Sequence, residues 1–491
     1  MFRSLIAILW VSLSIMWIVF DKGIRDGDEE GHVGTAEMFQ QWLYEDQTYH
    51  AINQAWRGQT GEYPPAASAA IGAWWWLSGE GQPGDPSVRG ALLMSLLVAA
   101  WATASLLRRR SEGPDSSRTG EIMAFATVLS LPLANGLSRH FMPEGFLIAC
   151  VAPAILAAVR AVEQPSPTRF AAVGLSIGLG MLVKQTFVLY VTIPLAWILA
   201  PVVRRQPVLS AFAAGLAALI CAPWYSTFWD QQVTYGQASA ESASQAGMLE
   251  QLIFYPAVLW WQGLGPVISA LVIAGAVVWI RERNEGVRLE ALAARRVVLA
   301  LVWIIGGLLV LSLVPKKYPR LVAPLTPAVG LLLGAWVMDR ARSRWLVLTG
   351  SAAMASWLVI ASTRLQPAPE IVEVVDPGCI QHWIRPPMDS DLGLHAASVA
   401  LRARPDGPVW VERAPDIPCE LQTTHPWAYH LGPFLRREGL DREVYILQED
   451  QPEPTEPATA RLVWDQDPPD VQVDELQTGF QVLGVDEEPT P

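Results

Sequence analysis

Long apolar runs constrain this chain more than any other feature of its sequence. A helix needs about 20 apolar residues to cross the ~30 Å hydrocarbon core of a bilayer. Only helices and closed barrels satisfy their backbone hydrogen bonds inside lipid. The pattern therefore predicts an all-α polytopic membrane domain of about 11 transmembrane helices. The runs are residues 4–20, 88–107, 120–138, 142–161, 169–183, 186–203, 208–226, 253–280, 297–314, 320–338 and 344–362.

Charge divides the chain into two parts. Residues 363–491 contain 24 Asp and Glu against 9 Arg and no Lys, whereas the rest of the chain carries a net charge of +3. We expect a membrane domain at 1–362 and an acidic soluble domain at 363–491, and this acidity argues against nucleic acid as a partner. Helix-like and strand-like segments alternate in the tail, which predicts an α/β domain with a Pro/Glu-rich linker at 449–459.

The four cysteines divide in the same way. Cys150 and Cys221 lie in apolar runs and are expected to be packing residues. Cys379 and Cys419 lie in the tail, where they would pair in an oxidising compartment. Two free thiols are an equally good interpretation of the tail cysteines.

The distribution of basic residues predicts the topology. Arg3 and the arginines at 108–110 belong on the cytoplasmic side, so the helix at 88–107 must run from outside to inside. The short Trp-rich segment 64–79 then cannot span, and we expect an interfacial helix within an outer-face loop at 21–87. The N-terminus is expected in the cytoplasm and the tail outside. For a bacterial protein, this means an inner-membrane protein with a periplasmic domain.

Two outer-face segments carry acidic residues and histidines. The first, "GDEEGHVGTA", follows the first apolar run, and the second, "SRHFMPEG", joins two apolar runs through a short connection. Each has an ordinary alternative, which is a solvated loop with a surface imidazole. The candidate residues are Asp28, Glu29, Glu30 and His32 in the first segment and Arg139, His140 and Glu144 in the second.

Basic residues also lie on the outer face, against the usual trend. The run before Lys184 has 15 residues and covers roughly 22 Å, so this lysine is expected at or below the outer interface in a polar cavity. The alternative is that it snorkels to the headgroups. The segment "PKKYPR" adds three more basic side chains, which suit a lipid phosphate as well as a solvated loop. These are Lys316, Lys317 and Arg320.

Four motifs in order make residues 1–362 resemble a known group of enzymes. They are "GDEEGHVGTA", "SRHFMPEGFLIA", "GLGMLVKQTFVLY" and "PKKYPRLVAPLTPAVGLLLGAW". The chain resembles a GT-C glycosyltransferase of the protein O-mannosyltransferase and aminoarabinose (lipid A) transferase type. It departs from the family pattern at Ala66, where a "PPL" segment has Leu, and at Glu144, where Asp is usual. Tyr318 stands three residues before the Leu of the last motif.

The resemblance implies transfer of a sugar from a polyprenyl-phosphate donor to a hydroxyl acceptor on the outer membrane face. A hydroxyl needs a carboxylate to accept its proton, and the departing phosphate needs fixed positive charge. By resemblance to the family's Asp-Glu pair, Asp28 is the expected base, with Glu29 next, and Glu144 positions the acceptor or shares that role. The expected phosphate-binding residues are Lys184, Lys316, Lys317, Arg320 and Arg139.

Other features of this activity remain open at the sequence level. The acceptor is a lipid such as lipid A, a protein or a polysaccharide. No cofactor is predicted. The alternative is a divalent cation held by His32 and His140 together with Asp28 or Glu144, but their spacing matches no standard ligand motif. A lipid-linked sugar flippase would also need basic residues at phosphate depth, although it has little use for the acidic cluster. A membrane scaffold would leave Lys184 unexplained.

Overall fold

The structure is a computed structural model of the whole chain. It describes residues 2–20, 27–44, 63–78, 85–108, 115–241, 247–284, 291–314 and 317–337, together with short stretches and single residues between 350 and 483. The chain divides into two compact units. The first contains the described helices up to residue 337 apart from the segment Val19–Gly34, and the second contains that segment and the described strands.

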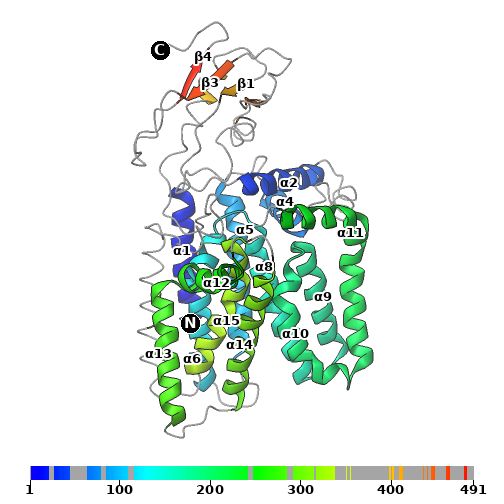
Figure 1. The fold of residues 1–491 in the computed structure, drawn as a ribbon, viewed down its shortest axis with the longest axis vertical. Helices are drawn as coiled ribbons and strands as arrows, with labels where there is room; N and C mark the ends of the chain where they lie inside the picture. The colour runs from blue at the N-terminus through cyan, green and yellow to red at the C-terminus, as the bar shows by residue number, and fades with distance from the viewer. Residues whose placement is uncertain are drawn as a thin grey trace. The chain divides into compact units, whose positions relative to one another are not determined.

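Helices account for the first unit, as the apolar runs predicted (Figure 1). Six of the described helices are long and apolar enough to cross a membrane, and three shorter apolar helices accompany them. The predicted count of 11 spans stays a prediction, because the run at 344–362 lies almost wholly outside the described residues. The helices are α1 (Phe2–Phe20), α2 (Gly27–Tyr44), α4 (Ala66–Ser78), α5 (Asp85–Ser105), α6 (Asp115–Ser130), α7 (Pro132–Leu137), α8 (Pro143–Glu163), α9 (Pro167–Val183), α10 (Phe187–Val203), α11 (Pro207–Glu241), α12 (Met248–Val258), α13 (Gly265–Asn284), α14 (Ala291–Ser312) and α15 (Thr326–Val337).

Three predicted runs contain breaks. The run at 120–138 is interrupted before Pro132, which begins α7. The run at 253–280 contains the π-helix η1 (Leu259–Leu264) between α12 and α13. The run at 320–338 begins as the 3₁₀-helix η2 (Pro319–Leu325). Irregular backbone is tolerated at membrane depth where protein surrounds it, and η1, η2 and α7 contact one another.

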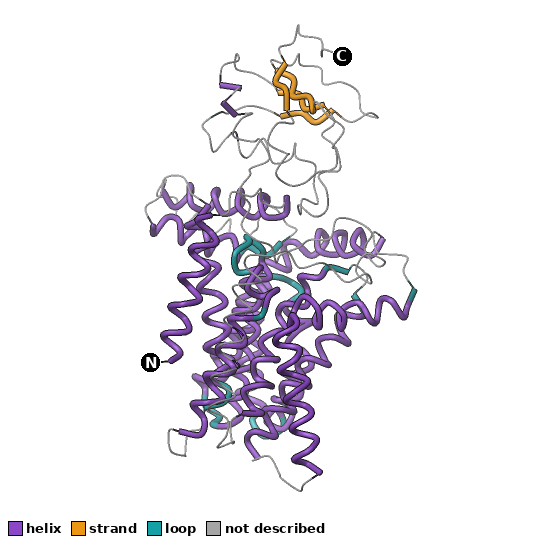
Figure 2. The backbone as a smooth tube through the Cα atoms, turned by 90° about the vertical axis from the view of Figure 1, so that its left-hand side faces the viewer, coloured by secondary structure: helices purple, strands orange, loops and turns teal. Residues whose placement is uncertain are grey.

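Close helix packing holds the bundle together. Helix α8 packs against α5, α9 and α10, and α14 packs against α10 and α15. Figure 2 shows these helices after a 90° turn, with the long ones running roughly side by side. Gly174 and Gly178 of α9 approach α11 so closely that a Cβ atom at either position would meet the backbone or side chains of α11. Small residues permit such approach between helices in membranes.

In its described part, the predicted outer-face loop at 21–87 contains the helices α2 and α4. Helix α4 coincides with the predicted interfacial helix at 64–79. Helix α2 was not predicted, because its polar first half shows no apolar stripe, but its second half packs against α4. A Cβ atom on Gly72 of α4 would collide with Ala36 and Phe39 of α2, so Gly72 permits this contact.

The second unit contains a four-stranded sheet in the order β2–β1–β3–β4. Strand β1 pairs in parallel with β2 and β3, and β4 pairs antiparallel with β3. Two of these strands lie in the strand-like segments predicted from the tail sequence. The α/β domain and the boundary near residue 363 otherwise stay predictions, and Cys379 and Cys419 lie outside the described residues. The strands are β1 (Val409–Glu412), β2 (Val444–Leu447), β3 (Ala460–Trp464) and β4 (Phe480–Leu483).

Candidate active site

Glu144 begins the site, in the first turn of α8. Pro143 occupies one of the first two positions of the helix, where its fixed φ and missing N–H cost nothing. A carboxylate in the first turn is favoured by the partial positive charge of the helix N-terminus. The side chain nevertheless has no exposure to solvent, with a relative surface of 0%. An ionisable group this deeply buried requires charged partners.

Lys184 is the first partner. It caps the C-terminus of α9 in an extended conformation, and its backbone N–H donates to the carbonyl of Gly180. Only Lys184, Gln185 and Thr186 separate α9 from α10. The residue is 6% exposed, so the prediction that it lies in the interior is favoured over snorkelling to the headgroups.

Arg320 is the second partner. It belongs to η2, which begins at Pro319 and is buried throughout its seven residues. The chain enters this 3₁₀-helix from an extended Tyr318, whose ring packs under the guanidinium of Arg320 at 4.7 Å. A planar guanidinium stacks readily on an aromatic face, which fixes its direction.

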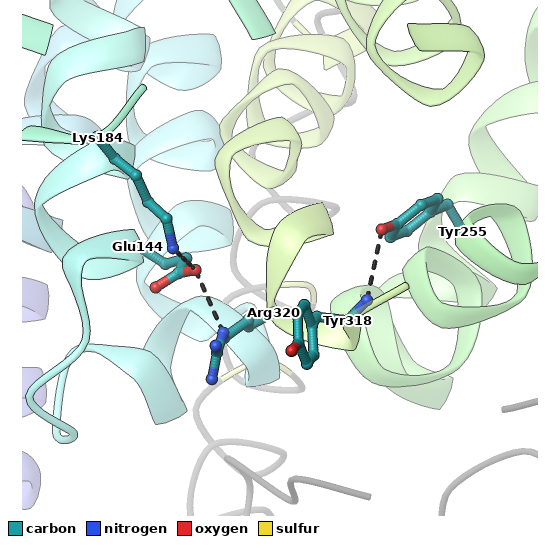
Figure 3. Close-up of polar contacts among 5 residues, drawn as sticks. All are labelled: Glu144, Lys184, Tyr255, Tyr318 and Arg320. Atoms are coloured by element: carbon teal, nitrogen blue, oxygen red, sulfur yellow. Dashed lines mark hydrogen bonds and ion pairs between the residues drawn. The ribbon is translucent and has the colours of Figure 1, made fainter. Parts of the chain in front are cut away.

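The three side chains meet in the protein interior (Figure 3). Lys184 Nζ donates to Glu144 Oε1 at 2.6 Å, and Arg320 Nε lies 3.3 Å from the same oxygen. Desolvating these charges is costly, and their mutual attraction offsets that cost only with close contact. Two cations on one carboxylate oxygen keep Glu144 ionised. The structure thus brings together three of the predicted site residues from three separate motifs.

Lys317 lies near this group but has a different set of contacts. Its ammonium donates to the carbonyls of Leu311 and Ser312 at the end of α14, at 3.3 and 2.8 Å. It also lies 5.1 Å from the ring centre of Tyr255. Lysines commonly satisfy the last carbonyls of a helix in this way. Burial lowers the pKa of Lys317 to about 8. The contacts favour a capping role over the predicted phosphate contact.

Tyr255 links this cap to the site. Its hydroxyl accepts a 3.5 Å hydrogen bond from the backbone N–H of Tyr318, and the ammonium of Lys317 lies over its ring. It is fully buried at the end of α12. Tyr255 was not predicted from the sequence, because an aromatic residue in an apolar run gives no local signal of such a role. The same holds for Tyr63, whose ring lies 5.3 Å from Lys184 Nζ.

Arg139 and His140 gather around Trp17 of α1. The guanidinium of Arg139 lies 5.1 Å from the Trp17 ring centre, and the His140 ring packs against Trp17 edge-on at 5.7 Å. Arg89 of α5 also lies over this ring. Arg139 and His140 are each 3% exposed, so the alternative of a surface imidazole is wrong. Both residues lie in the connection between α7 and α8. This connection is buried because α7 and the first turn of α8 are buried on either side of it.

Several predicted residues cannot be placed in detail. Asp28, Glu29 and Glu30 lie in the first turn of α2, but their side chains are outside the described residues, as is all of Lys316. His32 lies on α2 and is half-buried. Within the described residues, no group of three or more His, Cys, Asp or Glu is arranged to bind a metal ion. The roles predicted for these residues stay predictions.

A second set of ion pairs lies at the opposite end of the bundle. Arg296 of α14 contacts Glu163, the last residue of α8, at 2.7 Å, and Arg3 of α1 contacts Glu121 of α6 at 2.9 Å. Glu144 and Glu163 lie at opposite ends of α8, about 28 Å apart at ~1.5 Å per residue. This distance approaches the thickness of the hydrocarbon core. The site and the second set of ion pairs are therefore separated by about the thickness of that core.

Comparison with known proteins supports this architecture. The family model of dolichyl-phosphate-mannose-protein mannosyltransferases matches residues 84–229, a segment that contains Glu144 and Lys184. No curated protein sequence matches the chain. Two solved structures share the fold: ArnT from Cupriavidus metallidurans in the apo state and the same protein bound to undecaprenyl phosphate. The first has a TM-score of 0.61 at 13% identity and the second 0.58 at 14%, each covering 93% of this chain and 92% of the other.

These matches agree with the physical character of the chain. The apolar helices and the shared fold support an integral membrane protein. Two of the four motifs, "SRHFMPEGFLIA" and "GLGMLVKQTFVLY", lie within the residues that the family model matches. The family match and the shared fold together confirm the prediction that the chain resembles the GT-C superfamily of glycosyltransferases.

Proposed function

We propose that this protein is a membrane glycosyltransferase that moves a sugar from a polyprenyl-phosphate donor to a hydroxyl acceptor on the outer face of the membrane. The observation that carries the proposal is the buried group of Glu144, Lys184 and Arg320, where two cations converge on one point inside an apolar bundle. Intramembrane charges of this kind mark functional sites. One of the two structures that share the fold is bound to undecaprenyl phosphate.

The cations suit the leaving group of this reaction. The leaving group is polyprenyl phosphate. Negative charge develops on its phosphate as the bond between the anomeric carbon and the phosphate oxygen breaks. Lys184 and Arg320 offer fixed positive charge in a place that excludes water, where such stabilisation is strongest. Arginine also matches two phosphate oxygens through its planar fork. No strong general acid is required, because phosphate is already a good leaving group.

The acceptor hydroxyl requires a base. Asp28 is our choice, with Glu29 next, because both follow the first membrane helix as the family's acidic pair does. Glu144 is already in contact with two cations through Oε1. We assign it to orienting Lys184 and Arg320. The acceptor is a lipid such as lipid A, a protein or a polysaccharide, and a divalent cation is not required by this scheme.

The proposed topology follows the positive-inside rule. The N-terminus lies in the cytoplasm, and the acidic tail lies outside, in the periplasm of a bacterial cell. The Glu144 group then lies near the outer face, and the ion pair of Glu163 and Arg296 near the inner face.

Sugar transfer is the direct test. The full chain in lipid nanodiscs is supplied with a panel of radiolabelled undecaprenyl-phosphate sugars, and release of sugar to water or to envelope acceptors is followed. We expect release by the wild type and by the control E163Q, and loss of release in D28N and in K184Q. Each variant is first shown to be folded by its thermal unfolding.

Two outcomes would contradict the proposal. Tight donor binding without release, equal in the wild type and D28N, would indicate a lipid-linked sugar transporter. Neither binding nor release with any donor would remove polyprenyl-phosphate sugars as substrates and would favour a scaffold.

A further inference from the structure

The two carboxylate oxygens of Glu144 have different surroundings. Oε1 receives both cations, Lys184 Nζ at 2.6 Å and Arg320 Nε at 3.3 Å. Oε2 is buried and has no hydrogen-bond partner among the described residues. Figure 3 shows it turned away from Arg320. The carboxylate therefore has one oxygen fixed by the protein and one oxygen still able to accept.

The chemistry of an ionised carboxylate restricts what Oε2 can bind. It accepts hydrogen bonds and donates none. A buried acceptor without a partner is unfavourable, and natural proteins rarely keep one without a bound water or ligand group. A phosphodiester has only acceptor oxygens, so it does not suit this atom. The matching group is a hydroxyl or an amine.

The position of Oε2 further limits which hydrogen-bond donor of the substrate it can bind. Oε1 of the same carboxylate is held by the cations that would bind the donor phosphate. A group on Oε2 therefore lies next to that phosphate. In a glycosyl phosphate, the anomeric carbon carries the phosphate oxygen and has no donor of its own. The nearest donor is the substituent on the adjacent carbon, C2.

We propose that Glu144 recognises the donor sugar by accepting a hydrogen bond at Oε2 from the hydroxyl or amino group at C2. This inference rests on the proposed function and adds a specificity-determining residue to it. Glu144 then couples the two ends of the scissile bond, since it orients the phosphate-binding cations through Oε1 and the sugar through Oε2.

Two lipid probes test this without knowledge of the sugar. Undecaprenyl 2-hydroxyethyl phosphate has a hydroxyl two carbons from the ester oxygen, as a C2 hydroxyl is, and undecaprenyl ethyl phosphate lacks it. Both are phosphodiesters of the same charge. The dissociation constant of each is measured with the full chain in nanodiscs. Because hydrogen bonds to charged groups are strong, we expect the wild type to bind the hydroxyethyl probe roughly ten-fold to a hundred-fold more tightly.

Variants assign the effect to Glu144. In E144Q the preference should fall to roughly threefold or less, because a neutral amide is a weaker acceptor. E144D retains the negative charge, but its side chain is one methylene shorter and its carboxylate oxygens lie farther from the ligand. It should also lose most of the preference for the hydroxyethyl probe. The matched control is E163Q, which removes an ion-paired carboxylate at the other end of the same helix and should keep the wild-type ratio.

The outcomes separate this inference from the proposed function. Equal binding of both probes by the wild type would overturn the role of Glu144 and leave the polyprenyl-phosphate donor standing, whether or not any variant folds. A preference that survives in both E144Q and E144D would likewise overturn it. Failure of the wild type to bind either probe would overturn the proposed function and this inference with it.

Discussion

Lys184 and Glu144 are separated by 40 residues in the chain, yet they meet through a 2.6 Å hydrogen bond in the protein interior. Lys184 caps the C-terminus of α9, and Glu144 lies in the first turn of α8. The contact therefore joins the C-terminus of one helix to the N-terminus of its neighbour. Arg320 joins them from a third element. This arrangement gives the site a fixed geometry before any substrate arrives.

The first prediction is strong energetic coupling between these two residues. Lys184→Met alone leaves a buried carboxylate with one cation fewer and should destabilise the protein by about 3 kcal/mol or more. Combining it with Glu144→Gln should cost about 1–3 kcal/mol less than the sum of the single changes. Unfolding of the four forms in one detergent measures this. The pair of Arg296 and Glu163, whose carboxylate side is 41% exposed, should couple by less than about 1 kcal/mol. Additive effects at Lys184 and Glu144 would contradict the ion pair.

The second prediction concerns the turn that delivers Lys184. A Cβ atom on Gly180 would collide with the ring of Phe187 across the junction of α9 and α10. Gly180→Ala should therefore destabilise the protein by about 1–3 kcal/mol and weaken donor binding, because the Gly180 carbonyl also anchors the Lys184 N–H. Gly215→Ala is the control, since nothing lies within 4 Å of a Cβ atom there. It should be neutral or slightly stabilising. Equal thermal stability of the two variants would refute the packing argument.

The third prediction is a pH dependence from Lys317. Its pKa in the folded protein is lowered by burial to about 8, below its ordinary value of 10.5. Between these two values the unfolded chain binds more protons at this site, so stability rises with pH there. The wild type should gain stability relative to Lys317→Met as pH increases from about 8 to about 10. The melting temperatures of both forms across this range measure the effect. A difference that stays constant with pH would show that the amine titrates normally.

The fourth prediction separates Lys317 from Arg320. The ammonium of Lys317 is held by the carbonyls at the end of α14, whereas Arg320 faces Glu144. Lys317→Met should lower the melting temperature but change the dissociation constant for undecaprenyl phosphate by less than roughly threefold. Arg320→Met should weaken that binding by roughly ten-fold or more, since a charge-assisted contact is lost. Similar losses of affinity in both variants would restore Lys317 to the phosphate site.

Local sequence predicted most of the apolar helices and several of the residues that form the site. Apolar runs of membrane length leave the backbone no alternative to helix, so the boundaries of α8, α9 and α10 lie within two residues of the predicted runs. The short run before Lys184 predicted a lysine at or below the outer interface in a polar cavity, and the structure buries this side chain within the protein. Polar residues in an apolar chain are conspicuous, which is why Glu144, Lys184 and Arg320 were all candidates.

Tertiary packing decided what each candidate contacts. The sequence did not distinguish Lys317 from Arg320, since both follow α14 within a few residues. The aromatic residues that orient them, Tyr255 and Tyr318, belong to segments more than 60 residues apart. The helical second half of α2 was also not predicted, because its stability comes from packing against α4 rather than from an apolar stripe. Hydrophobic length determined where this chain crosses the bilayer. The choice of partner for each buried charge depended on the fold, because a charge is satisfied by whichever group packing brings within reach.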